Sequence, residues 1–218
     1  MTIDTEDLLN SILESLDRIE YVKPEDIPNI DLYMDQVTTF MERKLRSTAR
    51  YPGEDKILTK TMINNYAKND LLPPPIKKKY SKEHVFLLIF IYYYKNVLSI
   101  SDIQTLLRPI TEQFFQNGQK FNLESIYEEV IGMDEELVTR LKDCVKQEFK
   151  ESEDMFSEAP EESKDFLRKF AFICRLSFDV YLKKLMIEKM VDELAKEQKV
   201  VEEKEKEKEK GDKKSDKE

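Results

Sequence analysis

The sequence predicts an all-α protein. Only four glycines and no tryptophan occur among the 218 residues, a composition that suits long helices and leaves few residues for tight hairpins. Apolar residues recur at positions i, i+3 and i+4 in several segments, which is the period of an amphipathic helix. With 40% hydrophobic and 37% charged residues, the chain can bury one good core with a smaller helical lobe beside it.

The first predicted helix covers residues 6–20, EDLLNSILESLDRIE, where apolar residues follow helical spacing. Pro24 and Pro28 separate this helix from the next one, because proline interrupts helical hydrogen bonding. Residues 1–23 therefore form an N-terminal helical segment.

A second amphipathic helix is predicted over residues 31–45, with Asn29 or Asp31 as its N-cap. Residues 46–57, RSTARYPGEDKI, show no periodicity and include a Pro-Gly pair. We expect an exposed loop of about a dozen residues there, near the upper limit for ordinary connections.

The third predicted helix begins at Lys60 behind the N-cap Thr59, and three consecutive prolines stop it from continuing far beyond Leu71. At 100° per residue, one side of this helix is apolar and faces the core. The opposite side carries only hydrogen-bonding residues, namely Lys60, Thr61, Asn64, Asn65 and Lys68.

A fourth helix runs from the cap Ser81 to about Asn96 and is apolar on every side, which predicts a central position in the fold. His84 lies in its first turn, where we expect it at the surface or against a phosphate. Ser99 and Asp102 form a capping pair for a fifth helix that ends near Pro109. These helices complete a domain predicted over residues 24–112.

The second half of the chain predicts two longer helices, over residues 123–149 and 161–196. The last helix carries more large apolar residues than one packing face needs. Either it is fully buried within one chain or part of it meets a second subunit. Residues 113–200 thus form a C-terminal helical region that can form a dimer, and the charged residues 201–218 are predicted to be a disordered tail.

Several classes of function are excluded by composition. Cys144 and Cys174 stand thirty positions apart without a C-x-x-C pair, and His84 is the only histidine, so we expect no metal site and no cofactor. No motif joins an acid or a base to a nucleophile, so we expect no enzymatic activity. The longest apolar run has ten residues and the first residues are acidic, which predicts a cytoplasmic protein without a membrane span.

Positive charge is concentrated in one segment of an acidic chain. Residues 41–82 carry eleven Lys and Arg against four Asp and Glu, a net +7, while the whole chain carries −9. The rest of the chain is therefore −16. Such an imbalance indicates that one face binds an anion while the rest of the molecule stays clear of it.

The third helix has the properties of a helix that enters the DNA major groove. It combines a buried rear face, short polar side chains that reach base edges, and cations for phosphates. Asn64 is central on the polar face, and asparagine suits a bidentate contact with adenine. We expect the prolines to hold the IKKKY segment outward as a rigid wing. The predicted phosphate and backbone contacts are Lys77, Lys78, Lys79, Tyr80, Arg43, Arg46 and Arg50.

This order of elements, a polar helix, LLPPP, a basic wing ending in KYSKEHV, an apolar helix and LSISDIQTLL, resembles the MerR-type winged helix-turn-helix. The stretches DIPNIDLYMDQVTTFMERKL and LTKTMINNYAKNDLLPPPIKKKYSKEHV are more closely similar to a bacterial family defined only as a domain of unknown function and regarded as related to MerR. The resemblance spans about residues 24–109 and implies a DNA-binding domain. MerR-type proteins join their first two helices by a tight turn, whereas here residues 46–57 intervene.

Two functions are therefore predicted. The first is a transcriptional regulator that binds double-stranded DNA as a homodimer, for which the sequence identifies no effector. The alternative is a helical protein-interaction module whose basic segment docks an acidic partner. The salt dependence of binding distinguishes them, since contacts with DNA phosphates weaken steeply as salt rises.

Overall fold

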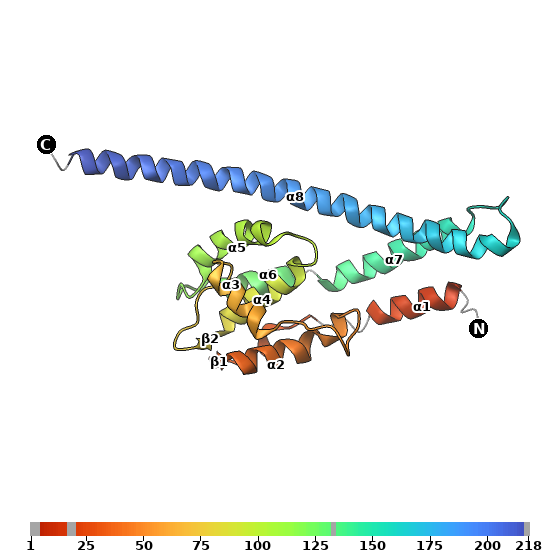
Figure 1. Cartoon of the computed structure of the whole chain (residues 1–218), viewed down its shortest axis with the longest axis horizontal. Helices are drawn as coiled ribbons and strands as arrows, with labels where there is room; N and C mark the ends of the chain where they lie inside the picture. The colour runs from red at the N-terminus through yellow and green to blue at the C-terminus, as the bar shows by residue number, and fades with distance from the viewer. Residues whose placement is uncertain (1–4, 17–20, 132–133, 216–218) are drawn as a thin grey trace.

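The computed structural model describes residues 5–16, 21–131 and 134–215, and it confirms the all-α prediction with the addition of one small sheet (Figure 1). A body of short helices is formed by residues 21–131. Three further helices, α1 (Thr5–Leu16), α7 (Asp134–Glu153) and the long α8 (Glu161–Ser215), extend from one end of it and across it.

The body begins with the short 3-10 helix η1 (Pro24–Asp26), strand β1 (Leu32–Tyr33), α2 (Met34–Leu45) and the 3-10 helix η2 (Arg46–Thr48). It continues with α3 (Lys60–Lys68), β2 (Lys79–Tyr80), α4 (Lys82–Tyr94), α5 (Ile100–Phe114) and α6 (Leu123–Ile131). The strands β1 and β2 pair in antiparallel register, with Leu32 opposite Tyr80.

Helix α4 is the centre of the body, as its uniformly apolar sequence predicts. Every residue from His84 to Tyr92 is buried. Tyr127 of α6 lies against Phe86 with ring centroids 4.4 Å apart, and its hydroxyl donates to the Val22 carbonyl at 2.6 Å. The main core therefore extends past residue 112 into α6.

A second, smaller core joins the extending helices. Leu9 and Leu13 of α1 pack with Val145 and Phe149 of α7, and Phe172 of α8 closes the cluster. In place of the single helix predicted over residues 123–149, the structure describes two helices, α6 ending at Ile131 and α7 beginning at Asp134; residues 132–133 between them lie outside the described part of the chain.

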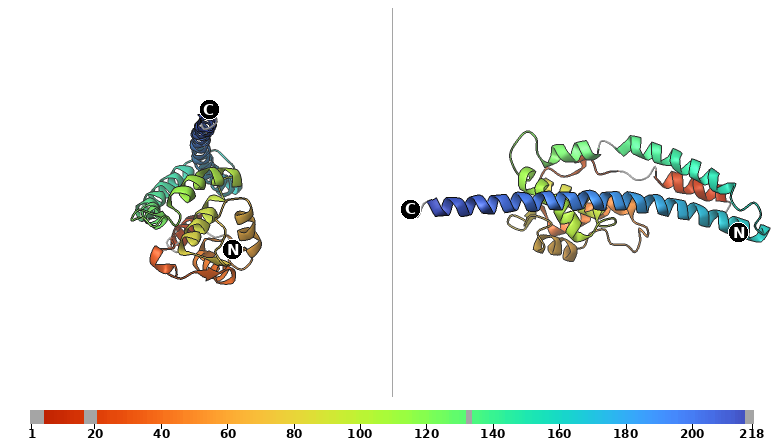
Figure 2. Two further views of the ribbon diagram at one scale, coloured as in Figure 1. Left: turned by 90° about the vertical axis from the view of Figure 1, so that its left-hand side faces the viewer. Right: turned by 90° about the horizontal axis from the view of Figure 1, so that it is seen from above.

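Helix α8 runs along the length of the molecule (Figure 2). It continues through residues 201–215, so the prediction of a disordered tail is wrong for these residues. Glutamate and lysine favour helix, and their alternation places opposite charges three positions apart. The last three residues of the predicted tail lie outside the described part of the chain.

Helix α8 docks on α5 at the place where a proline interrupts hydrogen bonding. We predicted that α5 ends near Pro109, but the helix continues to Phe114. Because proline has no N–H, the carbonyl of Thr105 lacks its usual partner four residues on. The Gln198 side-chain amide of α8 donates to this carbonyl at 2.9 Å, so an element distant in sequence satisfies it. Arg108 also pairs with Glu202 of α8.

The start of α2 differs from the prediction, whereas α3 ends before the prolines as predicted. Neither Asn29 nor Asp31 caps α2, since β1 occupies the preceding positions and the Gln36 side chain instead accepts from the Tyr33 N–H at 2.8 Å. Helix α3 ends at Lys68, before the prolines. Asp70 has a φ of 53°, and the Leu71 N–H donates to the Tyr66 carbonyl at 2.9 Å, which is the Schellman arrangement.

Candidate nucleic-acid interface

The outward face of α3 is the first part of the candidate interface. Thr59 caps the helix as predicted, with its hydroxyl accepting from the Met62 N–H at 3.1 Å. Ile63 and Tyr66 are buried and fix the rear of the helix to the core. The polar residues predicted for the opposite face, Lys60, Thr61, Asn64, Asn65 and Lys68, are all exposed.

Both ends of α3 are held in place. At the N-terminus, Lys60 forms an ion pair with Asp35 of α2. At the C-terminus, the Gln104 side chain of α5 donates to the Asn69 carbonyl at 3.1 Å. A helix restrained at both ends presents Asn64 and Asn65 in a fixed direction, which a reader of base edges requires. Lys60, in contrast, is already engaged within the chain.

The predicted wing is a tight β-hairpin. Ile76 and Lys79 exchange two backbone hydrogen bonds of 2.9 and 3.1 Å, and the two residues between them, Lys77 and Lys78, have φ angles of 49° and 64°. Two left-handed residues in a two-residue loop form a turn that normally selects Asn-Gly. Two lysines therefore stand exposed at the tip, held in a conformation that costs about 1 kcal/mol or more for each.

The base of the hairpin corrects one predicted contact residue. Tyr80 is buried in strand β2, with its ring edge-on to His84 at 5.5 Å between centroids, so it is not available to a partner. Tyr33 of β1 is exposed instead, and the Lys79 ammonium lies over its ring at 5.1 Å from the centroid. The sequence pattern missed Tyr33 because the pairing of β1 with β2 is a long-range contact.

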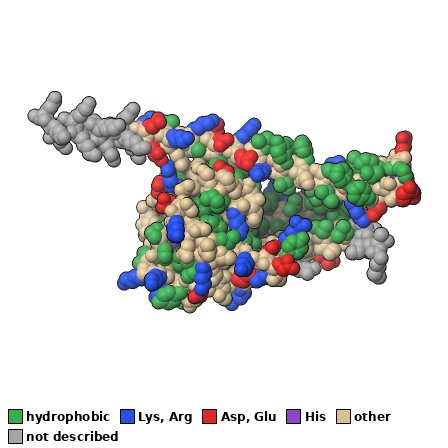
Figure 3. Space-filling model, viewed as in Figure 1, with side chains coloured by type: hydrophobic (Ala, Val, Ile, Leu, Met, Phe, Trp, Pro, Cys, Tyr) green, Lys and Arg blue, Asp and Glu red, His purple; other side chains and the backbone are tan. Residues whose placement is uncertain are grey.

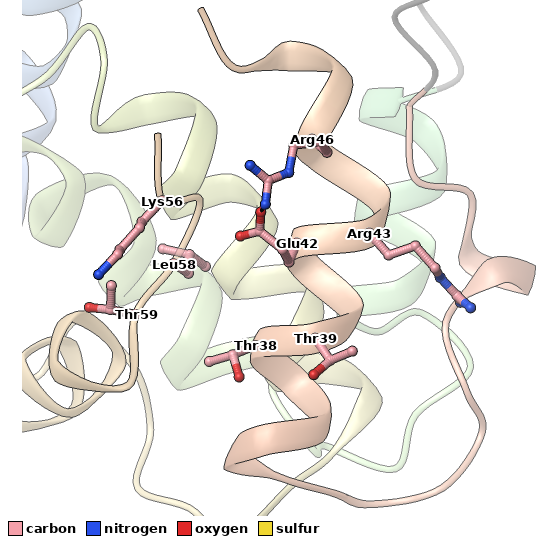
Figure 4. A pocket seen from close by; sticks show the side chains of 8 residues that line it. All are labelled: Thr38, Thr39, Glu42, Arg43, Arg46, Lys56, Leu58 and Thr59. Atoms are coloured by element: carbon pink, nitrogen blue, oxygen red, sulfur yellow. Dashed lines mark ion pairs between the residues drawn. The ribbon is translucent and has the colours of Figure 1, made fainter. Parts of the chain in front are cut away.

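A groove of about 650 Å³ lies between α2 and the N-terminus of α3 (Figure 4). Its walls are formed by Thr38, Thr39, Glu42, Arg43, Arg46, Lys56, Leu58 and Thr59. Lys56 was not among the predicted contact residues, although it belongs to the basic segment. Arg43 points to the far side of α2 from Lys56 (Figure 4), and it also lines a smaller hollow on that side.

The loop over residues 46–57 is braced rather than loose. Arg46 pairs with Glu42 and donates to the Pro52 carbonyl, while the Tyr51 N–H donates to Asp55 at 3.0 Å. The Lys95 ammonium donates to the Ile57 carbonyl at 2.9 Å. Partial burial desolvates the Lys95 ammonium at this junction and thereby lowers its pKa. Arg46 thus supports the loop and does not point freely outward.

The remaining cations of the segment have no acidic partner within the part of the chain that the structure describes. They are Arg43, Arg50, Lys56, Lys68, Lys77, Lys78 and Lys79, of which Arg50 lies over the Tyr51 ring. Figure 1 places α3 and the two-stranded β1–β2 sheet at the same end of the body, opposite α1 and α7. Blue side chains gather at this corner in Figure 3.

His84 lies beneath the hairpin, not at the surface as predicted. Only 1% of it is exposed, and its ring stands edge-on to Phe115 with centroids 4.8 Å apart. Its Nδ1 accepts from the Ser81 N–H at 2.9 Å, while Nε2 has no partner with hydrogen-bond geometry in the structure. Burial lowers the pKa of His84, and the nearby carbonyls of Pro74 and Pro73 oppose this shift in part. The buried His84 ring therefore joins β2 to the start of α4, through its contact with Tyr80 and its hydrogen bond with Ser81.

The described residues hold no group of three or more His, Cys, Asp and Glu side chains placed to share a metal ion. None of the helices, as far as they are described, is both long and apolar enough to cross a membrane.

Comparison with known protein families assigns the body of the molecule to a family. A family model for a domain of unknown function, DUF1836, matches residues 22–130, which is half of the chain. The chain belongs to the DUF1836 family. The DUF1836 segment begins at the buried Val22 and ends in α6, so it contains every buried residue of the main core except Val191 of α8. Every predicted contact residue lies within DUF1836.

The comparisons name no relative of known function. No curated protein and no solved structure matches the chain. Among the helices described, α1, α7 and α8 lie outside the DUF1836 segment.

Proposed function

We propose that this DUF1836 protein is a transcriptional regulator that binds double-stranded DNA through a MerR-like winged helix-turn-helix. The observation that carries the proposal is the pairing of two surfaces at one end of the body. One is a restrained helix whose outward side chains are Thr, Asn and Lys without an acid, and the other is a hairpin tip bearing Lys77 and Lys78.

The residues divide into two roles. Thr61, Asn64 and Asn65 supply short donors and acceptors for base edges in the major groove. Lys68 at the end of α3 and Lys77 and Lys78 at the hairpin tip supply sequence-independent phosphate contacts. Arg43, Arg50 and Lys56 widen the positive surface around α2 and the loop.

The alternative is that the same basic surface docks an acidic protein. The groove between α2 and α3 favours this function, because Lys56 and the Thr59 hydroxyl at its walls suit carboxylate side chains. DNA binding explains two further features that docking of an acidic protein does not, namely the lysine-bearing turn and the amide side chains on α3.

The salt dependence of DNA binding tests the proposal. Binding of the full chain to a 30-base-pair duplex of random sequence, followed by fluorescence anisotropy, should weaken steeply as salt rises from 50 to 200 mM. Lys77→Ala with Lys78→Ala should weaken binding to every duplex and flatten the log–log slope by about two. The matched control is Lys146→Ala with Lys150→Ala on α7, two exposed lysines distant from the interface, and its slope should not change.

Sequence-specific recognition of DNA bases is tested separately, on genomic fragments that the purified protein selects. Asn64→Ala should cost about 1–3 kcal/mol at one base position of the selected site and leave random-sequence binding unchanged. Absence of DNA binding at 50 mM salt contradicts the proposed function. Binding of an acidic peptide in its place would favour the alternative.

A further inference from the structure

The middle of α8 is exposed and carries large apolar side chains on every side, with charged residues between them. The N-terminal part of the helix packs on α7 through Phe172 and Leu176. Its C-terminal part joins the main core through Val191 and bonds to α5 through Gln198. Between these two contacts, no residue from Ser177 to Met190 is buried. This stretch is about 20 Å long. Large apolar residues on a helix are normally buried against a partner.

The exposed area is larger than a monomer usually presents. Eleven large apolar side chains of α8 between Phe166 and Met190 are at least 36% exposed, with Met186 at 65% and Met190 at 68%. At about 200 Å² for a fully exposed large side chain, they present roughly 1,200 Å². The largest apolar patch of a typical monomer is about 300–600 Å², whereas a standard interface buries about 800 Å² per partner.

Figure 3 shows this surface from one side. Hydrophobic side chains follow the right-hand half of the long upper helix, and the molecule is hollowed beneath the middle of that helix. Exposed rings are paired along it, with Phe166 stacked on Phe170 and Phe178 on Tyr181 at 6.3 and 6.2 Å between centroids. Exposed apolar side chains therefore occur along α8 from the α7 contact to the α5 contact.

Charge along α8 fits a second copy of the same helix in the opposite direction. From Arg168 to Lys184 the helix carries five cations and one anion, whereas from Glu188 to Glu197 it carries four anions and two cations. If two copies cross near Leu182, antiparallel pairing places the basic stretch of one beside the acidic stretch of the other. Parallel pairing in register places like charge beside like charge.

We propose that the protein forms a two-fold symmetric dimer in which the middle of α8 packs antiparallel against the α8 of a second copy, crossing near Leu182. The apolar area matches the area that a stable dimer needs, and the charge order sets the direction. Dimerisation through α8 does not depend on DNA binding, since the two surfaces share no residue.

Sedimentation velocity of the full chain tests the proposal. Between 1 and 100 µM the expected mass is about twice the 25.9 kDa of one chain. Tyr181→Glu with Met186→Glu introduces charge on two different sides of the helix, and we expect at least a tenfold weaker dimer with an unchanged helical circular dichroism spectrum. The matched control, Ile30→Glu with Val130→Glu, adds the same charge at exposed apolar residues of the body and should dimerise normally.

Direction is tested by cross-linking in a background with Cys144→Ser and Cys174→Ser. Leu182→Cys should cross-link to its copy through a short bismaleimide, whereas Phe166→Cys should not, since the two copies of residue 166 lie at opposite ends of the pair. Cross-linking at both positions indicates parallel helices and overturns the antiparallel arrangement. A monomer at 100 µM, or a dimer unaffected by the α8 substitutions, overturns the proposal altogether.

Discussion

Lys77 and Lys78 form the turn at the hairpin tip. Their backbone is strained, and their side chains are proposed to contact DNA phosphates. Both have left-handed φ angles, which glycine and asparagine adopt more readily than lysine. Lysine at such positions indicates that charge at the hairpin tip has been kept at the expense of stability, as is common at binding sites.

Replacing the turn separates these two effects. Lys77→Asn with Lys78→Gly should raise the free energy of unfolding by about 1–2 kcal/mol because the new residues fit the turn, and it should weaken DNA binding. Urea denaturation and anisotropy measure the two quantities. Lys77→Ala with Lys78→Ala removes the charge but keeps a strained backbone. This variant should weaken DNA binding without raising the free energy of unfolding. An unchanged free energy of unfolding in the Asn-Gly variant would show that the backbone at residues 77 and 78 is not strained.

His84 gives the fold a dependence on pH. Burial lowers its pKa in the folded state below the ordinary value of 6.5. As pH falls below 6.5, the unfolded chain takes up a proton that the folded chain does not, so stability decreases until the pH reaches the folded pKa. Urea midpoints between pH 7.5 and 5.0 should therefore fall.

His84→Gln is the control for this dependence. Glutamine at this position keeps a capping box with Ser81, since its side chain can accept from the Ser81 N–H, but it does not titrate. The variant should remain folded and lose the decrease in stability just below pH 6.5. An identical pH profile in both proteins would exclude His84 as the cause.

The sequence predicted those site residues whose environment is local. Thr59 as a cap and the exposure of Asn64 follow from a nine-residue helical pattern, and both agree with the structure. The burial of Tyr80 and His84 was missed because it results from strand pairing with β1, almost fifty residues earlier, and from contact with Phe115. No pattern near Tyr80 in the sequence indicates these partners.

At the scale of elements, helix ends were likewise predicted where they depend on local sequence and missed where they depend on long-range contacts. Local signals placed α3 and α4 correctly, but the end predicted for α5 was wrong because a proline was treated as a stop. Its unpaired Thr105 carbonyl is satisfied by Gln198, more than ninety residues later. A long-range hydrogen bond thus overrides a local rule.

A double-mutant cycle tests this contact. Gln198→Ala should lower the free energy of unfolding by about 1 kcal/mol, since it leaves the Thr105 carbonyl unpaired. In a Pro109→Ala background, residue 109 supplies its own N–H to that carbonyl, and Gln198→Ala should then cost much less. Equal costs in the two backgrounds would show that Gln198 does not serve the carbonyl freed by Pro109.

At the scale of the whole molecule, the chain combines a DUF1836 body with a second core of α1, α7 and α8. Composition predicted a main core with a helical lobe beside it, and the excess of apolar residues on α8 indicated more than one packing partner. The sequence did not show that α8 leaves its middle exposed, because this depends on where α5 and α7 stand relative to each other.

The central claim is that α3 and the hairpin lie against the same duplex. Backbone amide chemical-shift mapping of the ¹⁵N-labelled full chain during titration with a DNA duplex tests it most directly. The largest shifts should fall on residues 60–68 and 76–79, with smaller ones around Arg43 and Lys56 and none on α7. Shifts confined to α7 and α8, or to only one of the two proposed surfaces, would contradict the claim.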